Sequence, residues 1–252
     1  KFLKLSANII SKPLQKIFNL SLKNGIFPAC FKKAKITPIF KKGSKSDKSN
    51  YRPISILPIL SKILEKHVSY HLKLFLENNF LLSPYQSGFR SNHSCETALI
   101  SIVDKWINAI NEGNLVGTIF LDLTKAFDLI NHELLIEKLE MYNIDNNSIS
   151  WFKSYLSNRS QQVCVSGKYS SSQTITSGVP QGSVLGPLLF IIYINDLPLQ
   201  LSNSTSDMFA DDTTITSFGK TREDICHNLQ GDLESVQNWC KRNSMTPNAT
   251  KT

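Results

Sequence analysis

Two adjacent carboxylates, Asp211 and Asp212, are the feature that most restricts how this chain can fold. They separate a short apolar run, residues 208–210, from a β-branched run, residues 213–216. This pattern is typical of a tight hairpin with the acids at its bend. Because side chains alternate along a strand, both carboxylates serve one site only if the bend redirects one of them. Taken alone, the pair favours a solvated Asp-Asp turn.

A third carboxylate, Asp122, favours a shared site over a solvated turn. Residues 117–121 form an apolar, β-rich run that predicts a buried strand, and Asp122 lies at its end. A carboxylate in that place is costly to bury unless it is paired or bound to a metal. Like charges held close together also repel unless a cation is present. Asp122, Asp211 and Asp212 are therefore the ligand set expected for two Mg²⁺ ions, or Mn²⁺ as a substitute, acting on a phosphoryl group.

Composition narrows the class of partner without choosing one. The 252 residues suit one large domain or two small ones, and the net charge of +8 indicates a polyanionic partner, either nucleic acid or a membrane surface. The five cysteines form no C-x-x-C pair, which argues against a zinc ribbon or a disulfide framework and favours a reducing compartment. The longest apolar stretch, residues 184–194, is too short to span a bilayer and predicts a buried helix.

Three motifs in order resemble the palm of reverse transcriptases from LINE-type (non-LTR) retrotransposons. They are L-D-L-T-K-A-F-D from Leu121, S-G-V-P-Q-G-S-V-L-G-P-L-L-F from Ser177, and F-A-D-D from Phe209. The resemblance covers nearly the whole chain. It implies an α+β right-hand polymerase, with fingers and an N-terminal helical region over residues 1–113, and a palm with interleaved fingers and helical segments over residues 114–252. The palm would be a split β-α-β sheet with a catalytic Asp-Asp hairpin and helices on one face, and a thumb would be absent.

The same resemblance implies the activity and its partners. It is RNA-directed DNA synthesis, in which a DNA primer 3′-OH attacks a deoxynucleoside triphosphate opposite an RNA template. Asp122 and Asp211 would bridge two metal ions and Asp212 would complete the site. No membrane partner is expected, and the location would be intracellular, in the nucleus, the cytoplasm or both. The rival hypotheses are an RNA-dependent RNA polymerase, and a retrotransposon remnant that binds nucleic acid without turnover.

A basic loop is expected to hold the nucleotide's phosphates. Lys41, Lys42, Lys45 and Lys48 lie on a Gly/Ser-rich segment, with Arg52 just beyond it. Arginine binds phosphate through paired hydrogen bonds, and lysine acts as a point charge. A solvated basic loop is a fair alternative for Lys45 and Lys48. By resemblance, Arg52 and Lys42, or equally Lys41, hold the phosphates.

Phe127 would act as a steric gate by resemblance, its ring set against the sugar C2′ position to exclude a ribonucleotide's 2′-OH. A core phenylalanine is the alternative. Asp128, next to it, is expected to cap a helix over residues 131–141 and not to bind metal.

Two further segments are expected to contact the nucleotide or the nucleic acid by resemblance. Gln181 and Gly182 would lie beside the incoming nucleotide, and Ser183 is expected to cap a helix running to Leu197. The residues assigned to template or primer are Gln86, Gly88, Arg90, Gly178, Pro180 and Phe209. For the segment around Gln86, an Asx-rich turn explains the composition nearly as well.

Both ends of the chain suggest an interior fragment of a longer polyprotein with an endonuclease and a thumb. There is no initiating Met, and the first residues already show the pattern of an amphipathic helix. By resemblance, Lys251 is the general acid that protonates the pyrophosphate leaving group. His67 and His71 have the spacing of a zinc-binding helix but lack the intervening Glu, so they are expected to be surface residues.

Overall fold

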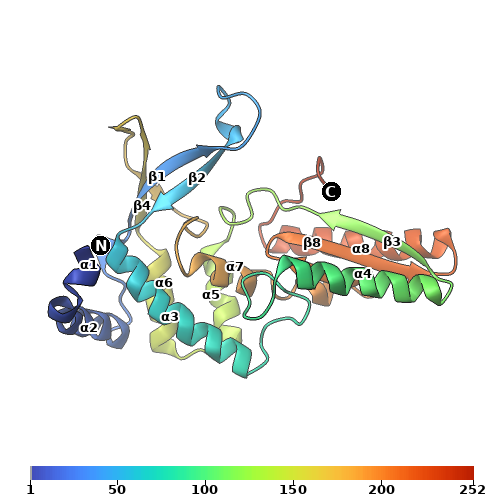
Figure 1. Cartoon of the computed structure of the whole chain (residues 1–252), viewed down its shortest axis with the longest axis horizontal. Helices are drawn as coiled ribbons and strands as arrows, with labels where there is room; N and C mark the ends of the chain where they lie inside the picture. Colours follow the sequence, from blue (N-terminus) through green and yellow to red (C-terminus); the bar gives the residue numbers. More distant parts are fainter. Residues whose placement is uncertain (1) are drawn as a thin grey trace.

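The computed structural model describes residues 2–252, in which helices connect and cover two β-sheets (Figure 1). The helices are α1 (Phe2–Leu5), α2 (Ala7–Lys23), α3 (Ile59–Asn78), α4 (Cys95–Asn111), α5 (His132–Met141), α6 (Asn146–Leu156), α7 (Gly186–Tyr193) and α8 (Arg222–Arg242). The strands are β1 (Lys33–Phe40), β2 (Tyr51–Ile56), β3 (Leu115–Leu121), β4 (Arg159–Val165), β5 (Lys168–Tyr169), β6 (Gln173–Ile175), β7 (Thr205–Phe209) and β8 (Asp212–Gly219). Short 3₁₀ helices are η1 (Ala29–Phe31), η2 (Lys48–Asn50) and η3 (Leu197–Gln200). The predicted α+β class is confirmed.

The first sheet has the strand order β2-β1-β4-β5, with β6 also paired to β4. Strands β1 and β2 form an antiparallel hairpin, whereas β1 and β4 are parallel. The sheet therefore combines strands from both sides of residue 113. In Figure 1 the β1–β2 hairpin projects away from the helices, with the basic loop at its tip.

The second sheet has the order β3-β8-β7, and β8 is antiparallel to both neighbours. Strands β3 and β7 consequently run in the same direction on either side of β8. The β7–β8 hairpin with acids at its bend is confirmed. The prediction that β3 is a buried strand is wrong, because β3 is at the sheet edge and helices cover it only partly: Leu121 is buried but Phe120 is 61% exposed.

Helices cover both faces of this sheet, which corrects the expectation of helices on one face. On one face, the indole Nε1 of Trp106 in α4 donates to Thr216 Oγ1 at 3.3 Å. On the other, Gly117 faces Ile225 of α8, and its cross-strand partner is Ser217. Adjacent strand residues point to opposite faces, so α4 and α8 lie on opposite sides of β8.

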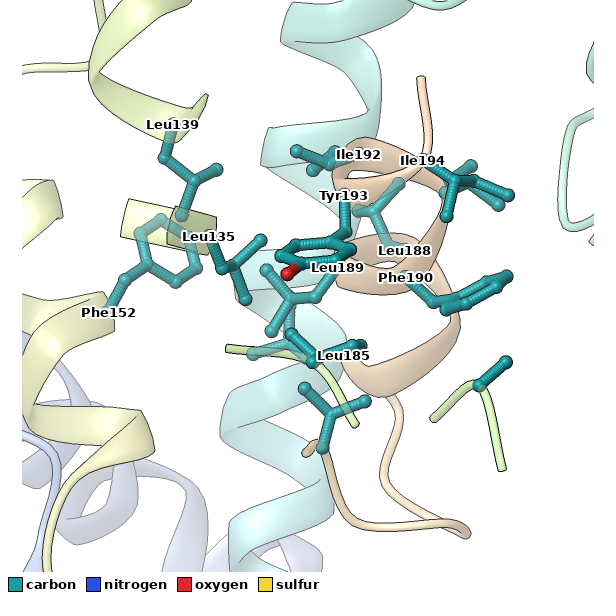
Figure 2. Close-up of a cluster of buried hydrophobic side chains, with 14 of the residues drawn as sticks. Leu135, Leu139, Phe152, Leu185, Leu188, Leu189, Phe190, Ile192, Tyr193 and Ile194 are labelled. Atoms are coloured by element: carbon teal, nitrogen blue, oxygen red, sulfur yellow. The ribbon is translucent and has the colours of Figure 1, made fainter. Parts of the chain in front are cut away.

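Helix α7 is the centre of the main core, and the predicted buried helix is confirmed. In Figure 2, Leu189 and Tyr193 of α7 lie toward Leu135 of α5, with Leu139 of α5 and Phe152 of α6 beyond it, whereas Phe190 points to the opposite side of the helix. The helix ends at Tyr193, earlier than predicted, and a 3₁₀ turn containing Pro198 follows. Ser183 Oγ accepts from the Gly186 amide at 2.9 Å and so supports the helix start. Among the helices of residues 2–252, none combines the length and apolarity needed to cross a bilayer.

Local signals predict most other helices well. Residues 58–78, 97–111 and 222–242 have the apolar periodicity of amphipathic helices, and they form α3, α4 and α8 with small boundary shifts. Asp128 does not cap α5; instead Asn131 Oδ1 accepts from the amides of Glu133 and Leu134 at 2.9 and 3.2 Å, because Asn131 directly precedes the first turn. His67 and His71 are exposed, as expected.

The packing of α8 on β3 leads to a test with two glycines. A Cβ at Gly117 would overlap Ile225 Cγ2 and lie 3.2 Å from Leu229 Cδ1, whereas a Cβ at Gly231 would meet nothing within 4 Å. We expect Gly117→Ala to lower the free energy of unfolding by about 1–3 kcal/mol through overpacking. We expect Gly231→Ala, in the interior of α8, to raise it by about 0.5–1 kcal/mol. Urea unfolding of both variants checks this, and equal effects would contradict the close contact of β3 with α8.

Candidate active site at the aspartate hairpin

The turn between β7 and β8 is built on an unusual backbone conformation. Ala210 has φ of 57°, a left-handed conformation that costs an L-residue about 1–2 kcal/mol. Asp211 follows it and is partly buried, and Asp212, exposed, is the first residue of β8. A left-handed residue at the bend is the device that redirects one of two adjacent side chains. Phe209, partly buried, pairs with Asp212 across the hairpin.

Strand register brings Asp122 to the same place. Leu121 pairs with Thr213 in the β3–β8 ladder, so Asp122 follows beside Asp212. The pKa of Asp211 is raised, first by burial and then by the negative charges of Asp212 and Asp122, with Lys251 opposing the shift. The three carboxylates therefore act electrostatically on one site.

Asp122 is held by residues from the other end of the chain. Its Oδ2 accepts from Asn248 Nδ2 at 2.7 Å and from Lys251 Nζ at 2.9 Å. The backbones also pair, since the Asn248 amide donates to Asp122 O and the Thr124 amide donates to Thr246 O, both at 2.8 Å. The Lys251 side chain is 61% exposed, and an ion pair this open to solvent contributes little stability. A cation could replace the Lys251 ammonium at small free-energy cost.

The donor chemistry fits a hard divalent cation, although the carboxylates are not closed around one. Carboxylate oxygens are the ligands that Mg²⁺ prefers, and the repulsion at Asp211 favours any added positive charge. Within residues 2–252, no three His, Cys, Asp or Glu side chains are close enough together to hold a metal ion in this conformation. A metal site at the three aspartates stays a prediction.

Phe127 lies on the loop that leaves β3 and is partly buried. Its ring stacks on Phe190 of α7, with centroids 4.6 Å apart, and meets Phe89 edge-on at 6.4 Å. One side of the ring is thus packed against the core. Packing on Phe190 is what a core phenylalanine would show, and it is also the rigid support that a steric gate would need. The gate role of Phe127 therefore stays a prediction.

The loop over residues 178–183 ties β2 to the segment after β3. Gln181 Nε2 donates to Asp128 Oδ1 at 3.0 Å, and Gln181 O accepts from the Ser55 amide at 2.7 Å. Gly178 has φ of +79°, and a Cβ there would lie 2.7 Å from Asp128 O. Gly178 and Pro180 are buried, whereas Gly182 is exposed. A hollow of about 410 Å³ adjoins this loop, lined in part by Asp128 and Gln181.

The segment around Gln86 is packed under the hairpin instead of open to solvent. The Gln86 side chain is buried, and it bonds to the backbone of Gly88 and Ala210. Arg90 Nη1 donates to the carbonyls of Ser83 and Gln86 at 2.9 and 3.3 Å. This placement gives Gln86 partners within the protein and no exposed surface for a template.

The basic loop is exposed, as predicted. Lys41 and Lys42 lie at the tip of the β1–β2 hairpin, and Arg52 is exposed on β2 opposite Ile39. The loop closes through the Lys41 amide, which donates to Asn50 O at 2.8 Å. No hydrogen bond or ion pair within the described residues joins it to the aspartates.

One residue at the site, Asn248, and one in the buried scaffold, Glu65, were not predicted from the sequence. Asn248 lies 126 positions from the carboxylate that it binds, and no local signal marks it. Glu65 is fully buried in α3, where its Oε2 accepts from the amides of Val184 and Leu185 at 2.8 and 3.3 Å and holds the start of α7. Its position next to Leu64, on the apolar face of a predicted helix, was a signal that could have identified it.

Comparison with known proteins shows similarity in both sequence and fold. A model of the family described as reverse transcriptase (RNA-dependent DNA polymerase) matches residues 39–252. The chain is similar to a probable RNA-directed DNA polymerase from transposon BS of Drosophila melanogaster, with 32% identity over 248 residues, covering 95% of this chain and 27% of the relative. It is also similar to the RNA-directed DNA polymerase from mobile element jockey of the same organism, with 32% identity over 252 residues, covering 94% of this chain and 27% of the relative.

The fold is similar to that of a solved telomerase from Candida albicans in complex with a fragment of telomeric RNA. The TM-score is 0.66 at 14% identity, covering 88% of this chain and 42% of that chain. Since this identity is low, the likeness concerns the fold alone. The chain spans about a quarter of the length of the curated relatives named above.

The crowded charge at Asp211 leads to a prediction about stability. A raised carboxyl pKa means that the folded state binds the proton more tightly than the unfolded chain does. The ionised carboxylate therefore lowers the free energy of unfolding, and protonation at lower pH removes this loss. We expect Asp211→Asn to raise the Tm at pH 7 in EDTA, and the difference from wild type to shrink as pH is lowered toward 4. Asp104→Asn, on the exposed face of α4, is the control and should leave Tm unchanged. A lower Tm for Asp211→Asn would show that the carboxylate stabilises the turn.

Proposed function

The chain belongs to the reverse transcriptase family, and from that premise we propose that Asp122, Asp211 and Asp212 form the centre of an RNA-directed DNA polymerase. The observation that carries the proposal is the β3–β8 register, which places Asp122 beside Asp212 at the bend that also holds Asp211. Burial, and then the charges of Asp212 and Asp122, raise the pKa of Asp211. The proposed substrates are an RNA template, a DNA primer and deoxynucleoside triphosphates. The length of the curated relatives supports a longer polyprotein as the natural context.

The proposed architecture is a palm and fingers. The palm is the β3-β8-β7 sheet with α4 and α8, where two like-directed strands flank an antiparallel one in a split β-α-β arrangement. The fingers are the β1–β2 hairpin and its sheet, together with the N-terminal helices. The division into residues 1–113 and 114–252 is approximate, because β4 belongs to the second range but pairs with β1.

Asp122, Asp211 and Asp212 would hold two divalent cations, Mg²⁺ or Mn²⁺, which supply charge neutralisation and activation of the primer 3′-OH. The chain's own contribution is the position of the oxygens. Asp122 Oδ2, which accepts from both Asn248 and Lys251, would contact a cation in place of the Lys251 ammonium, with the Asn248 hydrogen bond keeping the carboxylate oriented. The freed Lys251 ammonium would serve as the general acid toward the pyrophosphate leaving group.

The nucleotide would lie between the fingers and the aspartates. Arg52 and Lys42, with Lys41 as an equal candidate, are free to bind its phosphates because their side chains are exposed. Gln181 and Gly182 border the same region, since Gly182 approaches Ser55 on β2 closely. Phe127, supported by Phe190, would face the sugar.

Loss of a proposed metal ligand should abolish synthesis without unfolding the protein. In the natural full-length protein, we expect Asp211→Asn to reduce primer extension on an RNA template by about a hundredfold or more, because catalysis here is positioning and charge stabilisation. RNA binding should be nearly unchanged. Asp104→Asn is the matched control and should extend primers as wild type does. Wild-type turnover by the Asp211 variant would refute the assignment, and an inactive wild type would favour a remnant that only binds nucleic acid.

The gate hypothesis for Phe127 is tested by shortening its side chain. We expect Phe127→Val to lower discrimination against ribonucleotides by about tenfold or more, since it removes the ring proposed to clash with the 2′-OH. Deoxynucleotide use should change little. Phe218→Val is the matched control, because Phe218 is also partly buried but lies at the far end of β8. Unchanged discrimination in Phe127→Val would assign this ring to the core alone.

A further inference from the structure

A buried side-chain amide grips the backbone of the aspartate turn. Gln86 is only 1% exposed. Its Oε1 accepts from the Ala210 amide at 2.9 Å, and its Nε2 donates to the Ala210 carbonyl at 3.3 Å. Both polar groups of one peptide residue are thereby satisfied by one side chain. The residue so held is the one with φ of 57°, immediately before Asp211.

The two hydrogen bonds between Gln86 and Ala210 extend a strand pairing beyond the last backbone-to-backbone hydrogen bond. The segment before Gly88 runs along the open edge of β7, where the Met208 amide donates to Tyr85 O and the Ser87 amide donates to Met208 O, both at 2.8 Å. Gln86 and Met208 form a parallel bridge. The next residue that faces this edge is Ala210, just beyond the end of β7, and there the Gln86 side chain takes the place of a backbone partner.

Close approach of the two segments depends on Gly88. A Cβ at Gly88 would overlap the Ala210 amide nitrogen and lie 2.9 Å from Ala210 Cα. The Gly88 amide also donates to Gln86 Oε1 at 2.7 Å, which fixes the orientation of the side-chain amide. Since Gln86 Oε1 thus accepts two amide hydrogens, the oxygen must point at the turn and Nε2 at the Ala210 carbonyl.

We propose that Gln86 is a positioning residue that holds Ala210 in its left-handed conformation and thereby sets the direction of the Asp211 and Asp212 carboxylates. The inference rests on the proposed function of these acids. The surrounding structure must maintain a left-handed alanine against its intrinsic preference, and two hydrogen bonds in a water-excluded site are suited to do so. Gln86 itself touches neither substrate nor cation.

The test compares two glutamines, each of which makes hydrogen bonds on both sides of its amide. Gln86→Met keeps the length of the side chain but loses its hydrogen bonds. Gln200→Met loses bonds to the Asp196 carbonyl and to Arg242, outside the hairpin and the segment that grips it. We expect hydrogen exchange at residues 208–212 to become about tenfold faster in Gln86→Met, with little change in peptides from α7. Gln200→Met should leave residues 208–212 at the wild-type rate.

Two further measurements separate positioning from a general loss of stability. Calorimetric titration with MgCl₂ alone should show weaker binding by about tenfold in Gln86→Met. Primer extension should fall in kcat more than it rises in KM for deoxynucleotide. Unchanged exchange at residues 208–212, or faster exchange with unchanged Mg²⁺ binding and kcat, would overturn the proposal.

Should Gln86→Met fail to fold, Gln86→Glu gives the same test. Its carboxylate still accepts from both amides but no longer donates to the Ala210 carbonyl, and it adds a negative charge near Asp211. We expect faster exchange at residues 208–212 here too, and a wild-type rate would count against the proposal. Because exchange needs no turnover, an inactive wild type would refute the proposed polymerase function while leaving the role of Gln86 in the turn to be judged by exchange.

Discussion

The register of the β3–β8 ladder is the constraint on which the rest of the site depends. Seven residue pairs, from Leu115 with Gly219 to Leu121 with Thr213, place Asp122 beside Asp212 although 90 positions separate them in the sequence. A slip of one residue would move every side chain of β3 to the opposite face. Helices on both faces oppose such a slip, because Ile225 of α8 packs closely against Gly117 and Trp106 of α4 donates to Thr216. Packing far from the acids thus determines their spacing.

Several features of the site are unfavourable or only weakly stabilising on their own. Ala210 is in a conformation that alanine avoids, Asp211 is partly buried among other negative charges, and the Lys251 ion pair is open to solvent. What makes the arrangement persist is the buried scaffold around it, including α7 and the carboxylate of Glu65. A cation bound there would relieve the repulsion among the carboxylates. The repulsion in the cation-free site therefore adds to the affinity for a cation.

Sequence reasoning succeeded where a local pattern carries the signal. The Asp-Asp hairpin, the buried α7 and the amphipathic α3, α4 and α8 follow from periodicity and turn residues alone. Pairings between distant segments could not be predicted from the sequence. The contact of Asn248 with Asp122, the burial of Gln86 and the placement of α4 and α8 on opposite faces all depend on which segments become neighbours. Asp128 was assigned the wrong role because two acceptable capping residues, Asp128 and Asn131, lie three positions apart.

The parallel pairing of β1 with β4 has a consequence for the order of folding. The register joins Lys33 to Ser160 and Ile36 to Val163, so the strand made first waits for more than a hundred residues before its partner exists. The second sheet is completed later in the chain, since β3 needs β8. Such non-local pairing slows folding and leaves open strand edges exposed in the meantime. During synthesis the β1–β2 hairpin therefore emerges early, and the edge of β1 that pairs with β4 stays exposed until β4 is made.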